Sequence, residues 1–147
     1  MNTEDRTFRT TRTLPYNPEA VYAAFQMPEQ LAAWWGPDGF TNTFERFEFK
    51  TGGQWQFVMH SPDGQNYPNK NVFQALEPGR LVVIRHDCAP YFTLTVTLTP
   101  ADEDTHLTWE QVLDDAATAL AIKSIVIPAN EQNLDRLTRV LAASSTT

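Results

Sequence analysis

The side chains best suited to acid–base or nucleophilic chemistry in this sequence are three histidines and one cysteine. His86 shares the register of Val82 and Ile84 in an alternating segment, so we expect its imidazole on the inner face of a strand. Asp87 follows directly and points to the opposite face, so it is not expected to orient His86. Cys88 has no obvious basic neighbour except His86, and the sequence does not predict a reactive thiolate. His86 is therefore the best candidate for ligand contact or acid–base catalysis.

The other two histidines favour structural roles. His60 ends an alternating segment beside the turn at 62–64, and we expect a hydrogen bond to that turn. His106 follows an acidic turn and is out of phase with Trp109, which predicts a surface position. No metal-ligand spacing and no glycine-rich phosphate loop occurs, so no metal and no cofactor are expected, and a protein without catalytic activity is favoured.

A set of amide side chains shares the inward register of apolar neighbours. Gln111 is in phase with Trp109, while the remaining amides accompany Phe73 or the apolar stripe of the last helix, namely Asn69, Asn71, Asn130 and Asn133. Buried polar groups require partners. Their presence on one inner surface indicates a hydrogen-bond network, trapped water or a ligand, and the sequence leaves these three open.

Seven predicted strands, six of them consecutive and joined by short turns, position these residues. Their approximate ranges are 8–14, 44–49, 54–59, 69–76, 81–87, 92–99 and 107–113, with strict alternation of threonine in the sixth. Short turns between successive strands predict antiparallel pairing. The sequence thus indicates one antiparallel sheet with one apolar face.

Helices are predicted at two places in the chain. Asn17-Pro18 begins a first short helix and Met27-Pro28 a second, which ends at Gly36-Pro37. After the last strand, Asp114 or Asp115 caps a helix that we expect to break or kink at Pro128. A final amphipathic helix then covers 128–141.

This order of elements predicts an α+β fold in which a curved sheet encloses the last helix. A twisted sheet contacts such a helix well along its axis but poorly at its flanks, where pockets of about 300 Å³ or more form. At 34–35, adjacent tryptophans diverge by about 100° on a helix, so one is expected in the core and the other at the cavity mouth. The candidate ligand-contact residues are Trp35, Phe40, Trp55, Phe57, Asn69, Phe73, His86, Phe92, Leu94, Trp109, Gln111, Asn130, Asn133 and Leu134.

Composition excludes several classes of partner. The 147 residues carry a formal charge of −7, which repels phosphate backbones and anionic membranes, so no nucleic acid or membrane partner is expected. No apolar run of about 18 residues and no leader-like amino terminus occurs, and the lone cysteine forms no internal disulfide, which favours a cytoplasmic protein. The length fits a single domain over 1–147, with a core at about 6–141.

Several short runs resemble one family when taken together. They are Trp34-Trp35-Gly36-Pro37, Gly52-Gly53 with Trp55, Phe57, Met59 and His60, Pro62-Asp63-Gly64, Tyr67-Pro68-Asn69, and the stretch from Ala129 to Leu137. They are similar to the START-like, or helix-grip (SRPBCC), superfamily, in the branch that resembles the activator of the heat-shock chaperone ATPase. This resemblance implies a seven-stranded sheet around a carboxy-terminal helix, in a superfamily that binds lipids, hormones and polyketides and includes some enzymes.

Three functions follow as hypotheses. The leading one is a small-molecule-binding protein with an apolar or aromatic ligand between sheet and helix. The alternatives are an accessory factor for a chaperone ATPase and a cyclase- or dehydratase-like enzyme that uses His86. Sheet edges and exposed aromatic residues also make a homodimer plausible.

Overall fold

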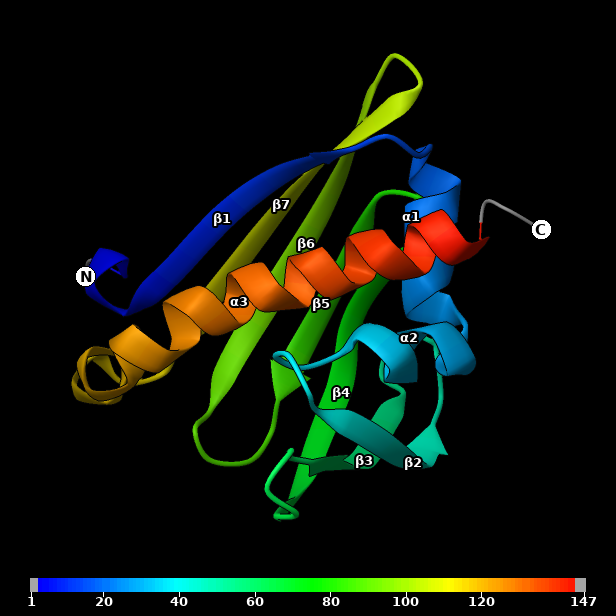
Figure 1. Ribbon diagram of the computed structural model, residues 1–147. Helices are drawn as coiled ribbons and strands as arrows, with labels where there is room; N and C mark the ends of the chain where they lie inside the picture. The colour runs from blue at the N-terminus through cyan, green and yellow to red at the C-terminus, as the bar shows by residue number, and fades with distance from the viewer. Residues whose placement is uncertain (1–2, 145–147) are drawn as a thin grey trace.

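Figure 1 shows a seven-stranded antiparallel sheet crossed by one long helix, in a computed structural model that describes residues 3–144. The strand order is β1-β7-β6-β5-β4-β3-β2. This arrangement confirms the predicted α+β helix-grip fold. The strands are β1 (Thr7–Leu14), β2 (Thr41–Phe47), β3 (Gln54–His60), β4 (Asn66–Glu77), β5 (Leu81–His86), β6 (Phe92–Ala101) and β7 (Asp104–Leu113). The helices are the 3-10 turn η1 (Glu4–Arg6), α1 (Pro18–Gln26), α2 (Pro28–Trp34) and α3 (Ala116–Ser144).

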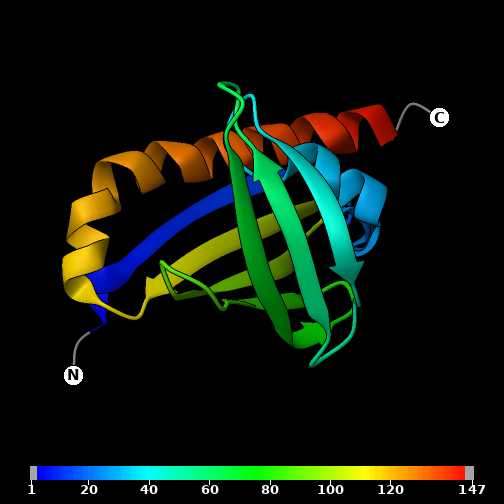
Figure 2. The ribbon, with the colours of Figure 1, turned by 90° about the horizontal axis from the view of Figure 1, so that it is seen from below.

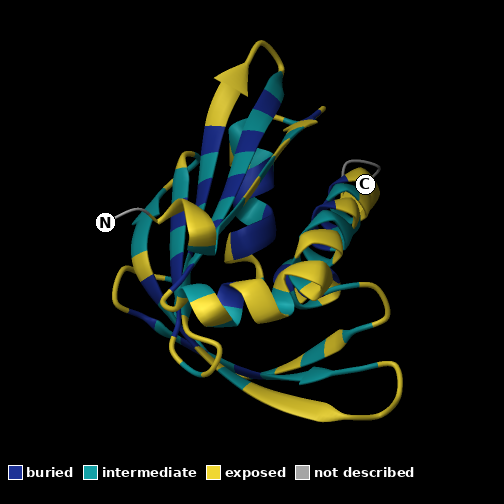
Figure 3. Ribbon diagram, turned by 90° about the vertical axis from the view of Figure 1, so that its left-hand side faces the viewer, coloured by how far each residue is buried: buried dark blue, intermediate teal, exposed yellow. Residues whose placement is uncertain are grey.

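The inner face of the sheet follows the alternation seen in the sequence. In β6, Leu94, Val96 and Leu98 are buried, while the intervening threonines are half-buried or exposed on the other face. Val96 pairs with Trp109 of β7, so large apolar side chains lie next to each other across strands. Figure 3 shows these buried positions as dark bands at alternate residues of the central strands.

Two irregularities bend the sheet where it curves toward the helices. The pairing register shifts between Phe44 and Arg46 in β2 and between Phe73 and Ala75 in β4. Such bulges increase the local twist and bend a strand. The predicted bounds of this strand are wrong: β2 covers Thr41–Phe47 rather than 44–49, because the strand pairs with β3 from Thr41 onward and its pairing ends at Phe47.

The short helices begin where the sequence predicts them. Asn17 caps α1, with its Oδ1 accepting a hydrogen bond of 2.8 Å from the amide of Ala20. Trp34, at the end of α2, is fully buried and donates from Nε1 to the carbonyl of Ala24 at 2.9 Å. This bond joins α2 to α1, and Trp34 is the tryptophan of the pair that fills the core.

The break predicted at Pro128 does not occur, because α3 is one continuous helix over Ala116–Ser144 with Pro128 inside it, but the alternative of a kink agrees with a bend ahead of the proline (Figure 2). Figure 2 shows that α3 changes direction in its first third, ahead of Pro128. A proline leaves the carbonyl four residues earlier without its helical donor. That residue, Ser124, is exposed to water, as is Pro128, so the lost bond costs little. Asp115, not Asp114, caps the helix by accepting from the amide of Thr118 at 2.8 Å.

The described residues, 3–144, contain no helix with the length and apolar character needed to cross a membrane.

Arg136 fixes the second half of α3 against the segment that follows α2. Its guanidinium donates hydrogen bonds of 2.8–3.3 Å to five backbone carbonyls, those of Ala33, Trp35, Gly36, Pro37 and Phe40. Several of these carbonyls belong to the carboxyl end of α2, where positive charge is favoured. Burial lowers the pKa of Arg136. We call the segment 33–40 the tryptophan loop.

Two amides of α3 complete this contact. Asn133 Oδ1 accepts from the amide of Gly36 at 2.9 Å, and Gln132 Oε1 accepts from the amide of Asp38 at 3.1 Å. Gly36 has a φ of +101°, a conformation that is strained for residues with a Cβ, and this favours glycine there. Two runs of the family motif, Trp34-Trp35-Gly36-Pro37 and the stretch from Ala129 to Leu137, are therefore the two sides of one interface between α3 and the tryptophan loop.

We expect Arg136→Lys to lower the free energy of unfolding by about 3 kcal/mol, because a lysine has three donors and cannot span five carbonyls in a planar fork. Urea unfolding followed by circular dichroism measures the change. Arg139→Lys is the matched control, since Arg139 is 67% exposed and lies 3.6 Å from Asp38. Equal loss in both variants would show that the carbonyl contacts of Arg136 contribute nothing specific.

Candidate functional site

A pocket of about 140 Å³ lies between the inner face of the sheet and the middle of α3. The tryptophan loop forms one wall, β6 and β7 form the floor, and α3 covers it. Its lining residues are Trp35, Gly36, Pro37, Met59, Phe92, Leu94, Trp109, Gln111, Asn130 and Asn133. We call this space the inner pocket.

Amide side chains form the polar edge of the inner pocket. Asn130 donates from Nδ2 to Gln111 Oε1 at 3.1 Å, which joins α3 to β7. Asn133 is occupied by its bond to Gly36. The inward amides predicted from the sequence therefore have partners within the protein, but in separate bonds rather than in one network: Asn71 bonds to His86, and Asn69 bonds to the carbonyl of Tyr67.

Trp109 carries a buried polar atom without a protein partner. The side chain is 2% exposed, and its Nε1 has no hydrogen-bond acceptor among residues 3–144. Trp55 Nε1 is also buried without a hydrogen-bond acceptor among residues 3–144. Trp55 does not line the inner pocket, however, and its ring contacts that of Trp35 edge-to-face with centroids 4.9 Å apart. Leaving a buried donor unpaired costs about 1–3 kcal/mol. Trp109 thus places an unpaired donor on a residue of the pocket wall.

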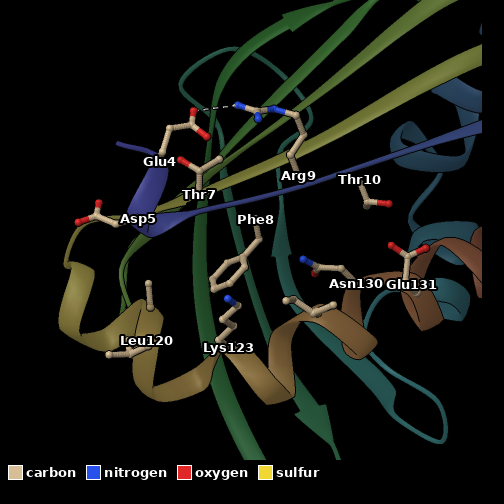
Figure 4. A pocket seen from close by; sticks show the side chains of 12 residues that line it. Glu4, Asp5, Thr7, Phe8, Arg9, Thr10, Leu120, Lys123, Asn130 and Glu131 are labelled. Atoms are coloured by element: carbon tan, nitrogen blue, oxygen red, sulfur yellow. Dashed lines mark ion pairs between the residues drawn. The ribbon is translucent and has the colours of Figure 1, made fainter. Parts of the chain in front are cut away.

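A second and larger pocket, of about 470 Å³, lies between β1 and the first half of α3. Figure 4 shows Phe8 of β1 pointing toward Lys123 of α3, while Arg9 turns away toward Glu4, with which it forms an ion pair at 3.8 Å. We call this space the outer groove. Asn130 lines both the outer groove and the inner pocket, so the Asn130–Gln111 pair lies at the boundary between them.

The structure brings half of the predicted contact residues to the inner pocket: Trp35, Phe92, Leu94, Trp109, Gln111, Asn130 and Asn133. Four others fill the hydrophobic core instead, with exposures of 0–1%: Trp55, Phe57, Phe73 and Leu134. Phe40 packs near Tyr67 with ring centroids 6.4 Å apart, and Asn69 lies at a separate surface pocket. The inner pocket is also lined by Gly36, Pro37 and Met59, which were not among the predicted contact residues. All three belong to the family motifs, which were the available signal.

His86 lies beside the inner pocket rather than in its wall. Its ring stacks on that of Phe92 at 4.5 Å between centroids, and its Nδ1 lies 2.8 Å from Asn71 Oδ1. Asn71 is therefore the group that orients His86, in agreement with the expectation that Asp87 does not. Burial is the main cause that lowers the pKa of His86 from 6.5 to about 4, and the charge of Arg85 adds to it.

The remaining histidines have structural contacts. His60 Nε2 lies 2.7 Å from Thr43 Oγ1 on β2, and its Nδ1 lies 2.7 Å from Asn66 Oδ1, which follows the turn at 62–64, so the predicted bond to a residue of the turn itself is wrong. His106 Nδ1 lies 3.4 Å from Thr13 Oγ1. Within the part of the chain that the structure describes, no three His, Cys, Asp or Glu side chains are grouped so that they could hold a metal ion.

The pKa of His86 predicts a loss of stability in acid. Above pH 6.5 the imidazole is neutral in both states, but between about pH 6.5 and 4 the unfolded chain binds a proton that the folded chain does not. The free energy of unfolding should fall by up to about 3 kcal/mol over this window.

Urea unfolding at several pH values measures this loss, and His86→Gln should remove it while His60→Gln retains it. If His86→Gln and the wild type lose stability equally between pH 6.5 and 4, His86 is not the group responsible.

Comparison with known proteins agrees with the geometry. A crystal structure of a protein from Nitrosomonas europaea is similar with a TM-score of 0.89 at 17% identity, covering 98% of this chain and 99% of that one. A solution structure from Arthrobacter aurescens has a TM-score of 0.88 at 21% identity, covering 97% and 90%. A crystal structure of an AHSA1 protein from Silicibacter pomeroyi has a TM-score of 0.76 at 21% identity, covering 94% and 99%. At these identities the likeness shows the fold alone.

No curated protein matches the sequence with significance. The family model described as "Activator of Hsp90 ATPase homolog 1-like protein" matches residues 15–142 and so includes the tryptophan loop, the sheet from β2 onward and nearly all of α3. The chain therefore belongs to the family of Activator of Hsp90 ATPase homolog 1-like proteins, within the helix-grip fold.

Proposed function

We propose that this protein binds a small, mainly aromatic molecule in the inner pocket. The observation that carries the proposal is the unpaired indole N–H of Trp109, which is buried in a wall otherwise built from apolar and amide side chains. Nε1 itself is not exposed in the pocket wall, so a ligand carbonyl or ether oxygen would accept this hydrogen bond after a small shift of the neighbouring side chains and would then offset the cost of the buried donor.

The size of the two pockets determines the shape of the proposed ligand. Small-molecule pockets usually measure about 300–1,000 Å³. The inner pocket, at about 140 Å³, suits one ring, whereas the outer groove, at about 470 Å³, offers room for a longer substituent. A ligand with an aromatic head in the inner pocket would pass Asn130 and continue between β1 and α3.

The polar residues along this path favour a ligand of low net charge. The groove is lined by Lys123 and Glu131 of α3 and by Asp5 of η1, and Glu131 is paired with Arg12 at 2.9 Å, so both signs of charge occur along the groove. In the inner pocket, the Asn130–Gln111 pair offers amide groups to a ligand hydroxyl or carbonyl. These contacts support an uncharged head group with a polar substituent.

The alternative of an accessory factor for a chaperone ATPase rests on the family name, which refers to an activator of Hsp90 ATPase. No contact among the described residues favours it over ligand binding. Stimulation of a chaperone ATPase by the purified chain would support this alternative.

Acetophenone and α-methylstyrene form a matched probe pair, because they have nearly the same shape but only the ketone carries a hydrogen-bond acceptor. The wild type should bind acetophenone about fivefold to tenfold more tightly, the value of one hydrogen bond. Trp109→Phe should remove this difference because it removes the N–H and keeps an aromatic ring. Calorimetric titration measures both affinities.

Trp55→Phe is the control, since it removes an equally buried indole N–H away from the inner pocket. It should keep the preference for the ketone. Absence of saturable binding of either probe up to millimolar concentration, or the same preference in wild type and Trp109→Phe, would contradict the proposal.

A further inference from the structure

Three side chains beside the inner pocket form a continuous hydrogen-bonded chain that the proposed function does not use. Cys88 Sγ lies 3.4 Å from His86 Nε2, and His86 Nδ1 lies 2.8 Å from Asn71 Oδ1. The order is thiol, imidazole, amide. A nucleophile within reach of a base that a third group orients is the arrangement used in nucleophilic catalysis.

The amide determines which imidazole nitrogen can act as a base. Because the partner of Nδ1 is the carbonyl oxygen of Asn71, Nδ1 carries the proton and donates it. Nε2 then holds a free lone pair directed at the thiol of Cys88. Burial keeps the ring neutral at physiological pH, since it lowers the pKa of His86 to about 4. Phe92 stacks on the ring and limits its rotation.

Cys88 is accessible from a surface pocket that is separate from the inner pocket. It is half-buried and lines a depression of about 400 Å³ together with Glu45, Gln56, Pro68, Asn69 and Lys70. The lining carries one side chain of each charge, Lys70 and Glu45, and the amides of Gln56 and Asn69 are the neutral hydrogen-bond donors that it offers to a carbonyl oxygen of a bound substrate. A substrate can therefore reach the thiol from solvent without entering the space under α3.

We propose that Cys88 is the nucleophile of an acyl-transfer site for activated esters or thioesters, with His86 as its base and Asn71 as a positioning residue. In the first step the Cys88 thiol gives its proton to His86 Nε2 while sulfur bonds to the acyl carbon. The bond to the leaving group then breaks, and the departing alcohol or thiol takes the proton from Nε2. The product is an acyl thioester on Cys88, which water can hydrolyse by the same proton path.

The probe for this site is p-nitrophenyl acetate with the full chain. One equivalent of nitrophenol should be released per chain, and intact-mass and peptide analysis should place one acetyl group on Cys88. Cys88→Ser should abolish both signals. An ordinary thiol reacts through its thiolate, so its rate falls tenfold per pH unit below about 8.5.

The pH profile distinguishes the site from an ordinary thiol. The wild-type acylation rate should stay level between about pH 5 and 7 and fall only near the pKa of His86 at about 4. His86→Gln should lower the rate at pH 6 at least about tenfold and restore the steep thiolate profile. Asn71→Asp should move the acidic inflection to higher pH, because a carboxylate stabilises the imidazolium; a merely structural role for Asn71 would leave the inflection in place.

His60→Gln is the matched control, since His60 is also held between two polar side chains but has no cysteine beside it. Its rate should equal that of the wild type. A wild-type rate that falls tenfold per pH unit from pH 8 to 5, or acetylation at sites other than Cys88, would overturn the proposal. The pH profile of the wild type is decisive by itself, so the test remains valid if His86→Gln does not fold. Its outcome does not depend on whether the inner pocket binds a ligand at Trp109.

Discussion

The contact between the Arg136 guanidinium and five carbonyls of the tryptophan loop holds the remaining parts of the site in place. It fixes α3 over the sheet and places Trp35 near Trp109, with ring centroids 6.1 Å apart. Asn133 adds the bond to Gly36, whose positive φ turns the chain at the end of α2. A helix held by hydrogen bonds at this loop can leave space beneath its middle, because apolar contact along its whole length is not required.

The polar interior explains why the space under α3 is small and divided. Asn130 bonds to Gln111, and Asn71 bonds to His86, so each of these two pairs has a partner within the protein. The unpaired buried donor in the pocket wall belongs to Trp109, which was predicted from the sequence as a contact residue, with no indication that its N–H lacks a partner. The row Asn71–His86–Phe92 then separates the inner pocket from the depression at Cys88. Gln56 and Lys70, which line that depression, alternate along β3 and β4 with the buried residues Trp55, Phe57 and Asn71, so the two sites open on different faces of the sheet.

Much of the fold could be predicted because local signals agreed with tertiary packing. Each of three local signals favours a single structure: Asn17 a helix start, the alternation in β6 a strand with one buried face, and Gly36 the turn that ends α2. Pro128 misled the prediction because its cost depends on whether Ser124 is exposed, which only the fold decides. The pairing of Asn71 with His86, and of His86 with Cys88, depends on strand register and on the path after β5, neither of which periodicity determines. The size of the inner pocket depends on side-chain packing and was also beyond the sequence.

Diffraction from crystals under xenon pressure tests the central claim, that α3 lies across the sheet without filling the space below it. Xenon enters apolar cavities of about this size and is seen directly in electron density. The account predicts a xenon peak between Trp35, Leu94 and Trp109, with α3 held at Arg136 as described. Side chains in continuous contact there, with no xenon at any pressure tolerated by the crystal, would contradict it.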